Sequence, residues 1–200
     1  MKIPENVRLM MENRAHSIAN GEYASFICDI EEQMEAAEEK DTPIVSPVEQ
    51  MFLIGWNFWR RSHLCAWRPE ERPGLRPQYK DKTTGKYRID FTVDFIEAIV
   101  NCPIDSIFCN NEQEIFSRFP EPLVGIEIDG HQWHEKTKEQ ARRDKERERF
   151  LVAAGWKILR FTGSEVFNDT DKCVCEVLDC ANSLAVPYFK SIRSYLNGKA

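Results

Sequence analysis

Residues 87–91 read Tyr-Arg-Ile-Asp-Phe, and residues 125–131 read Gly-Ile-Glu-Ile-Asp-Gly-His. In both stretches apolar and polar side chains alternate, which is typical of β-strands that bury one face. Each stretch also carries acidic residues inside a segment that otherwise indicates a buried strand. An unpaired ionised carboxylate is costly to bury, so such a group is normally paired, protonated or bound to a metal ion. The simplest common partner for these acids is a divalent cation.

The length and composition indicate one globular domain that can bury a hydrophobic core. The chain has 200 residues, of which 42% are hydrophobic. No apolar run approaches the roughly 18 residues that span a bilayer. Residues 1–5 lead into charged sequence rather than a signal-peptide core. We therefore expect a cytoplasmic protein without a membrane anchor.

The net charge of −6 is concentrated at the N-terminus. Residues 1–45 hold 10 acidic and 4 basic side chains, which leaves 23 of each sign in residues 46–200. A neutral body with local basic patches can still hold DNA or RNA. The 7 cysteines include no Cys-x-x-Cys pair, which argues against a disulfide framework or a structural zinc site. Cys173, Cys175 and Cys180 suit the small apolar positions of a C-terminal helix, although their spacing could also bind a metal.

The helices and strands can be placed along most of the chain. Residues 1–45 indicate acidic helices, and Ser46-Pro47-Val48-Glu49 has the form of a helix start. Residues 97–121 indicate an irregular excursion. The pattern predicts helices at 47–61 and 137–154, strands at 78–82, 86–96, 123–129 and 156–161, a helix beginning near Thr162, and two helices between 171 and 197 divided near Pro187. In the second strand, the core face carries Ile89, Phe91, Val93 and Phe95.

This order of elements predicts an α/β (α+β) fold, with a mixed central sheet flanked by helices. The last strand, helix and strand should form a right-handed parallel crossover. We expect an acidic helical extension at 1–45, a core at 46–168 and C-terminal helices packed on the core at 169–200.

Three acids are expected to converge on one side of this sheet. Glu127 and Asp129 lie two residues apart in a strand and project together, and Asp90 can lie beside them on the adjacent strand. Oxygen ligands of this kind suit Mg²⁺ or Mn²⁺. The natural reaction for such a site is hydrolysis of a phosphodiester.

A combination of short motifs resembles the PD-(D/E)xK restriction-endonuclease-like superfamily. Within this superfamily, the chain is most similar to the very-short-patch-repair-like endonuclease-related proteins. The resemblance covers residues 46–168. The motifs are Asp90 in Arg-Ile-Asp-Phe, Ile-Glu127-Ile-Asp129-Gly130, His134, Asp144-x-x-Arg147, Leu151, Gly155 and Leu-Arg160-Phe.

The resemblance implies an αβββαβ core with extra N- and C-terminal helices. It also implies that Asp90, Glu127 and the Ile128 carbonyl bind the metal, and that Glu49 reaches the same site from the preceding helix. The lysine that usually follows the second acid by two residues is replaced here by Asp129. His134 is the first candidate to take its place, because histidine transfers protons near neutral pH, and Gln132 and His131 are second choices.

Basic residues near the site indicate how a nucleic acid could bind. Arg147 lies on the same face of its helix as Asp144 and can point toward the acids, and Arg143 lies nearby on that helix. The other candidates lie in or next to a proline-rich basic stretch, and they are Arg76, Lys80, Lys82 and Arg88.

The sequence thus predicts an endonuclease that depends on Mg²⁺ or Mn²⁺ and acts on DNA. The alternative is a catalytically inactive nucleic-acid-binding or interaction module that keeps the fold. A third reading is a zinc hydrolase that uses His131 and His134. The terminal helices could serve a homodimer or a protein partner.

Each candidate ligand also has a structural interpretation. Glu49 could close a capping box with Ser46. Asp90 and Glu127 could pair with Arg88 or Arg160 in a structural ion network.

Overall fold

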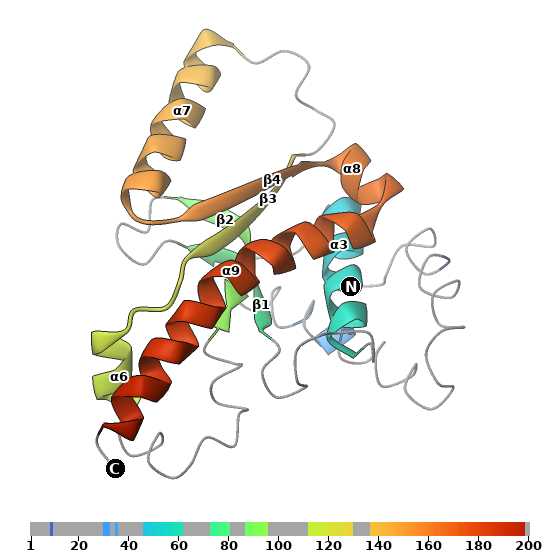
Figure 1. The fold of residues 1–200 in the computed structure, drawn as a ribbon. Coiled ribbons are helices and arrows are strands. Elements are labelled where there is room, and N and C mark those ends of the chain that lie inside the picture. The colour runs from blue at the N-terminus through green and yellow to red at the C-terminus, as the bar shows by residue number, and fades with distance from the viewer. Residues whose placement is uncertain are drawn as a thin grey trace.

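The computed structural model describes residues 9, 30–32, 35, 46–61, 73–80, 87–95, 112–129 and 137–198. Its helices are α3 (Pro47–Arg61), α6 (Glu112–Arg118), α7 (Lys138–Ala153), α8 (Gly163–Asn168) and α9 (Thr170–Asn197). Its strands are β1 (Gly74–Lys80), β2 (Arg88–Asp94), β3 (Val124–Asp129) and β4 (Lys157–Thr162) (Figure 1). The order α3, β1, β2, β3, α7, β4 is the expected αβββαβ arrangement, with α6 added between β2 and β3.

The four strands form one mixed sheet in the order β1-β2-β3-β4. The pairs β1–β2 and β2–β3 are antiparallel, whereas β3 and β4 are parallel. A parallel pair needs a crossover connection, and α7 forms it. In Figure 1, α7 lies on one side of the sheet, and α3 and α9 lie on the other. The predicted mixed sheet flanked by helices is confirmed.

The main hydrophobic core lies between the sheet and the helices α3 and α9. The ring of Phe52 on α3 lies 5.6 Å from that of Phe91 on β2 and 6.2 Å from that of Phe161 on β4. Helix α9 adds a stripe of buried apolar residues at helical spacing, among them Val174, Val177, Ala181, Ala185 and Ile192. This packing fixes α3 against the sheet and with it Glu49, which lies in the first turn of α3.

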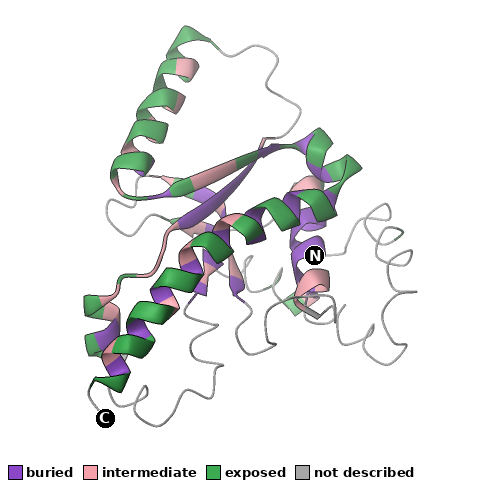
Figure 2. Cartoon of the chain, viewed as in Figure 1, coloured by how far each residue is buried: buried purple, intermediate pink, exposed green. Residues whose placement is uncertain are grey.

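A smaller cluster fills the space between the sheet and α7. Its buried members are Ile89, Leu151 and Trp156. A Cβ atom on Gly125 would lie 2.6 Å from Cδ1 of Ile158, so glycine gives that side chain the room to lie over β3. Among the residues of α7, all of which are described, Leu151 alone is buried. Most of the helix surface is therefore exposed (Figure 2).

The alternation predicted for the second strand is present only in part, because Thr92, between Phe91 and Val93, is also buried and the apolar residues do not all lie on one side of the sheet. Ile89, Phe91, Val93 and Phe95 are all buried. Ile89 packs in the smaller cluster, whereas the other three pack in the main core. The side chain of Asp90, between Ile89 and Phe91, accepts a hydrogen bond from a backbone amide of β3.

The first strand begins earlier than predicted. The sequence predicts a strand at 78–82 that follows a proline-rich loop, but β1 runs from Gly74 to Lys80. The strand lies at the edge of the described sheet. An edge strand tolerates proline, because one side of its backbone need not pair.

The C-terminal region forms one helix where the sequence predicts two. Helix α9 continues through Pro187, although proline lacks an N–H and crowds the preceding helical turn. The buried stripe continues on both sides of this position, with Ala185, Tyr188 and Ile192 facing the core. Pro187 itself is exposed. Tertiary packing therefore overrides the local preference for a break.

Most of the other boundaries agree closely with the sequence, and α3 has the predicted bounds. The irregular excursion predicted at 97–121 is wrong for residues 112–118, which form α6. Thr137 and Thr162 form capping boxes at the starts of α7 and α8. Of residues 1–45 the structure describes 9, 30–32 and 35, which are helical, and the rest of the expected acidic helices lies outside the described residues. No helix in the described part of the chain is long and apolar enough to cross a membrane.

Replacing Pro187 by alanine should stabilise the protein. Proline in a helix interior costs about 3 kcal/mol relative to alanine, and part of the gain is offset because alanine makes the unfolded chain more flexible. We expect the free energy of unfolding in urea to rise by about 1–2 kcal/mol. Lys190→Ala, at an exposed position of the same helix, serves as the control. A loss of stability in Pro187→Ala would show that the proline is required for the course of α9.

Candidate active site

The candidate site lies where β2, β3 and α3 meet. Asp90 lies on β2, Glu127 on β3 and Glu49 on α3. Glu127 is buried, with 5% of its surface exposed, and the other two are partly buried. Burial raises the pKa of both Glu49 and Glu127, and the negative charge of Asp90 adds to the rise in each, so Asp90 acts electrostatically on both glutamates.

Two arginines compensate the charge of Glu127. Nη2 of Arg147, on α7, lies 2.5 Å from Oε1 of Glu127, and Nε of Arg160, on β4, donates to Oε2 at 2.9 Å. The contact at Oε1 is close but misaligned, so this buried oxygen accepts no hydrogen bond within the described part of the chain. Burial raises the pKa of Glu127, and the two guanidinium groups oppose that rise.

Asp90 is held by the backbone of the neighbouring strand. Its Oδ2 accepts a hydrogen bond of 2.9 Å from the amide nitrogen of Ile128. Burial raises its pKa, Asp129 adds to the rise, and Arg147 and Arg88 oppose it. The Ile128 residue thus touches Asp90 through its N–H, whereas the resemblance implies a metal ligand at its carbonyl.

Glu49 reaches the site from α3 and meets a residue that the sequence did not single out. Its Oε2 accepts a hydrogen bond of 2.9 Å from Nε2 of Gln78 on β1. Gln78 is buried, and its φ of 50° is the one positive φ among the described non-glycine residues. The strand register places it opposite Asp90, because Pro77 pairs with Phe91 and Tyr79 with Ile89. Burial and repulsion from Asp90 raise the pKa of Glu49 to about 7.

Arg160 is the second residue whose position matters more than the sequence indicates. The parallel register pairs Glu127 with Arg160 on adjacent strands. The ion network considered from the sequence is therefore present for Glu127 and Arg160. The sequence offers Arg160 as a motif residue and as one of two possible partners of the acids, but it does not show which acid Arg160 contacts.

The remaining predicted site residues fall into two groups. Asp129 lies at the end of β3 and is partly buried, whereas Arg143, Lys80 and Arg88 are exposed on α7, β1 and β2. The backbone oxygen of Arg88 accepts a hydrogen bond of 2.5 Å from Nη2 of Arg147. The residues that lie outside the described part of the chain are His131, Gln132, His134 and Lys82.

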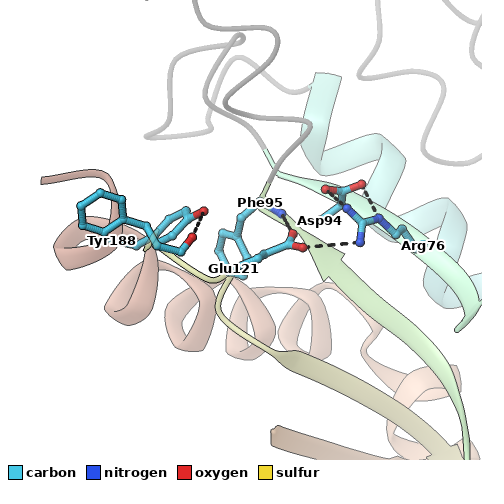
Figure 3. A network of polar contacts seen from close by, with 6 residues as sticks. Arg76, Asp94, Phe95, Glu121 and Tyr188 are labelled. Atoms are coloured by element: carbon cyan, nitrogen blue, oxygen red, sulfur yellow. Dashed lines mark hydrogen bonds and ion pairs between the residues drawn. The ribbon is translucent and has the colours of Figure 1, made fainter. Parts of the chain in front are cut away.

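Arg76 belongs to a separate ion network (Figure 3). Its guanidinium contacts both carboxylate oxygens of Asp94 at 2.5 Å and lies 3.5 Å from Oε2 of Glu121. Oε1 of Glu121 accepts a hydrogen bond of 2.7 Å from the amide of Phe95. The network ties β1 and β2 to the segment before β3. The structure does not bring Arg76 to the acids, and its role in binding nucleic acid stays a prediction.

The described acids do not themselves form a complete metal cage. Within the described residues, no group of three or more His, Cys, Asp or Glu side chains is placed to hold a metal ion. The chemistry of the donors nevertheless suits Mg²⁺ or Mn²⁺, because Asp90 and Glu127 offer carboxylate oxygens and Oε1 of Glu127 accepts no hydrogen bond. Cys173 is buried in the main core, and Cys175 and Cys180 are also free thiols on α9.

The comparison with known proteins supports a restriction-endonuclease-like relationship. Residues 104–180 match the model of the family REase_MTES_1575, which is a restriction-endonuclease-like family. The matched range contains Glu127, Arg147 and Arg160 and does not extend to Glu49 or Asp90. It does not confirm the very-short-patch-repair-like branch. No curated protein and no solved structure matches the chain.

The raised pKa of Glu49 predicts a pH-dependent stability of the metal-free protein. The pKa of Glu49 is 4.5 at its ordinary value and about 7 in the folded protein. Between these two pH values the folded protein keeps a proton on Glu49 that the unfolded chain has already released. The stability linked to Glu49 is therefore fully present below pH 4.5 and is lost as the pH rises through about 7. Glu49→Gln cannot ionise and avoids this loss. We expect its stability relative to the wild type to increase by about 1–2 kcal/mol between pH 5 and pH 8.

Urea unfolding in EDTA at the two pH values measures this difference. Glu148→Gln removes the same charge from an exposed position of α7 and should show no comparable change. An equal stability difference between Glu49→Gln and wild type at both pH values would contradict the proposed environment of Glu49.

Proposed function

We propose that the protein is an endonuclease that depends on Mg²⁺ or Mn²⁺ and hydrolyses phosphodiester bonds of DNA. The proposal rests on the acids Asp90 and Glu127 on adjacent strands, and on Oε1 of the buried Glu127, which is in an ion pair with Arg147 but accepts no hydrogen bond. The match to a restriction-endonuclease-like family supports a nuclease-type function.

The residues of the site would have different roles in this reaction. Asp90 and Glu127 would hold the cation, and Glu49 would approach it from α3 when its carboxyl group is ionised. The bound cation would activate water and neutralise the charge that develops on the phosphate. The amide of Ile128 orients Asp90, and Gln78 orients Glu49. His134 stays our candidate for the residue that moves a proton, because Asp129 is an acid and cannot replace a lysine.

A second candidate function is an inactive nucleic-acid-binding module. Two observations favour it. Asp129 stands where the resemblance implies a lysine, and Glu127 is already neutralised by Arg147 and Arg160. This module would bind DNA without requiring Asp90 or Glu127 for any chemical step. The zinc hydrolase interpretation depends on His131 and His134, which lie outside the described residues.

Cleavage of supercoiled plasmid and of labelled single strands tests the proposal. We expect cutting with Mg²⁺ or Mn²⁺ in the wild type and a loss of at least about a hundredfold in Asp90→Asn and Glu127→Gln, because each removes a metal ligand. Glu148→Gln, which removes a charge from an exposed site on α7, should cut like the wild type. The ratio of nicked to linear product distinguishes a monomer from a homodimer with two active sites.

A folded protein that binds DNA but cuts no substrate with either cation would establish the inactive module. Cutting that persists in both site variants would place the active site elsewhere in the chain.

A further inference from the structure

Two positive side chains converge on one negative side chain in the centre of the site. Arg147 approaches Glu127 from α7 and Arg160 approaches it from β4, each contacting a different carboxylate oxygen. One carboxylate needs only one positive charge for neutrality. Burial raises the pKa of Asp90, and the positive charge of Arg147 opposes that rise, so this guanidinium acts on both proposed metal ligands.

Both guanidinium groups keep donors that their described contacts do not use. A guanidinium has five N–H donors. Arg160 uses Nε for Glu127. Arg147 uses Nη2 for the backbone oxygen of Arg88 and for its ion pair with Glu127. The side chains of Arg147 and Arg160 are 25% and 36% exposed, so solvent and a ligand can reach them.

The helix that carries Arg147 has few other attachments at this point. Leu151 is the buried residue of α7, and Phe150 is partly buried and packs against the ring of Tyr87 at 5.2 Å. The two contacts of Arg147 are polar links between this part of α7 and the sheet. Loss of the contact with Glu127 would let the guanidinium turn without unpacking Leu151.

A divalent cation would reverse the electrostatics of this arrangement. It adds two positive charges next to Glu127 and Asp90, and it repels the guanidinium groups that neutralise Glu127 in its absence. The released guanidinium groups then need an anion. A phosphate of the nucleic acid backbone suits them, because arginine binds phosphate oxygens with paired N–H donors.

We propose that Arg147 and Arg160 move from Glu127 to a backbone phosphate when a divalent cation occupies the Asp90–Glu127 pair. The two arginines are thus the phosphate-binding residues of the site, and Glu127 holds them in place until the cation binds. The inference rests on the proposed function. It predicts that each arginine weakens cation binding and strengthens cation-dependent DNA binding.

The test compares wild type with Arg147→Gln and Arg160→Gln in two binding measurements. Calorimetric titration of the DNA-free protein with Mg²⁺ should show binding about three- to tenfold tighter in both variants, because a competing ion pair is removed. Binding of a labelled short DNA duplex is measured against salt concentration, once in EDTA and once in Ca²⁺, which takes the same oxygen ligands.

In Ca²⁺ each variant should bind the duplex roughly tenfold more weakly, and the slope of log K against log salt should fall in magnitude by about 0.9. In EDTA the slopes of variants and wild type should be equal, because Glu127 holds the arginines. Arg149→Gln, which removes the same charge from an exposed position of α7, should leave the affinity for Mg²⁺ unchanged. A purely structural role would not make the effect on DNA binding depend on the cation.

Unchanged or weaker Mg²⁺ binding in both variants would overturn the inference, as would an equal fall of the salt slope in EDTA and in Ca²⁺. If Arg147→Gln does not fold, Arg147→Lys keeps the charge and loses the paired donors, and it should retain the salt slope but bind the duplex more weakly in Ca²⁺. A wild type that binds no divalent cation refutes both the inference and the proposed function. A wild type that binds the cation and cuts nothing refutes the nuclease alone, because the exchange is still measured by the two binding experiments.

Discussion

The burial of a single carboxylate, that of Glu127, is the constraint on which the centre of this structure depends. Its position on β3, between β2 and β4, removes it from water. An uncompensated charge there would be strongly destabilising. The fold supplies the compensation from two directions, because the parallel register of β3 and β4 brings Arg160 alongside and the crossover helix α7 brings Arg147 from above the strand. The same two elements would be needed to position a substrate.

The surrounding packing serves this arrangement. Gly125, two residues before Glu127, leaves room for Ile158 and Ile89 to fill the face under α7. The main core on the other face holds α3 in place through Phe52 and its ring contacts with β2 and β4. A rigid α3 brings Glu49 to the acids, where the buried Gln78 receives it. The consequence is that burial raises the pKa of all three acids, and that the charge of Asp90 adds to the rise in Glu49 and Glu127.

The sequence predicts the parts of this structure that depend on local patterns. Alternation around Asp90 and Glu127 identifies β2 and β3, the motif that begins at Ser46 identifies α3, and the capping box of Thr137 identifies α7. It fails where distant parts of the chain decide the outcome. Pro187 lies inside α9 because the core continues past it, and Pro77 lies inside β1 because that strand is at the edge of the sheet.

For the candidate site too, the sequence predicts some features and misses others. Asp90 and Glu127 are identifiable because acids inside apolar strands are unusual. The sequence offers Arg160 only as one of two possible partners of these acids, since its pairing with Glu127 requires the register of two parallel strands. It does not indicate the contact of Glu49 with Gln78, which requires the packing of a helix on an edge strand. Arg147 faces the site as its helical position predicts, but its partner is Glu127, whereas the sequence favours a phosphate.

A crystal structure of the protein grown with Mn²⁺ would show whether a cation binds at the Asp90–Glu127 pair, because anomalous scattering locates the ion independently of the protein atoms. We expect an anomalous peak between the carboxylates of Asp90 and Glu127, with the guanidinium groups of Arg147 and Arg160 turned away from Glu127. A structure at saturating Mn²⁺ in which both arginines still contact Glu127 and no ion lies beside Asp90 would contradict this expectation.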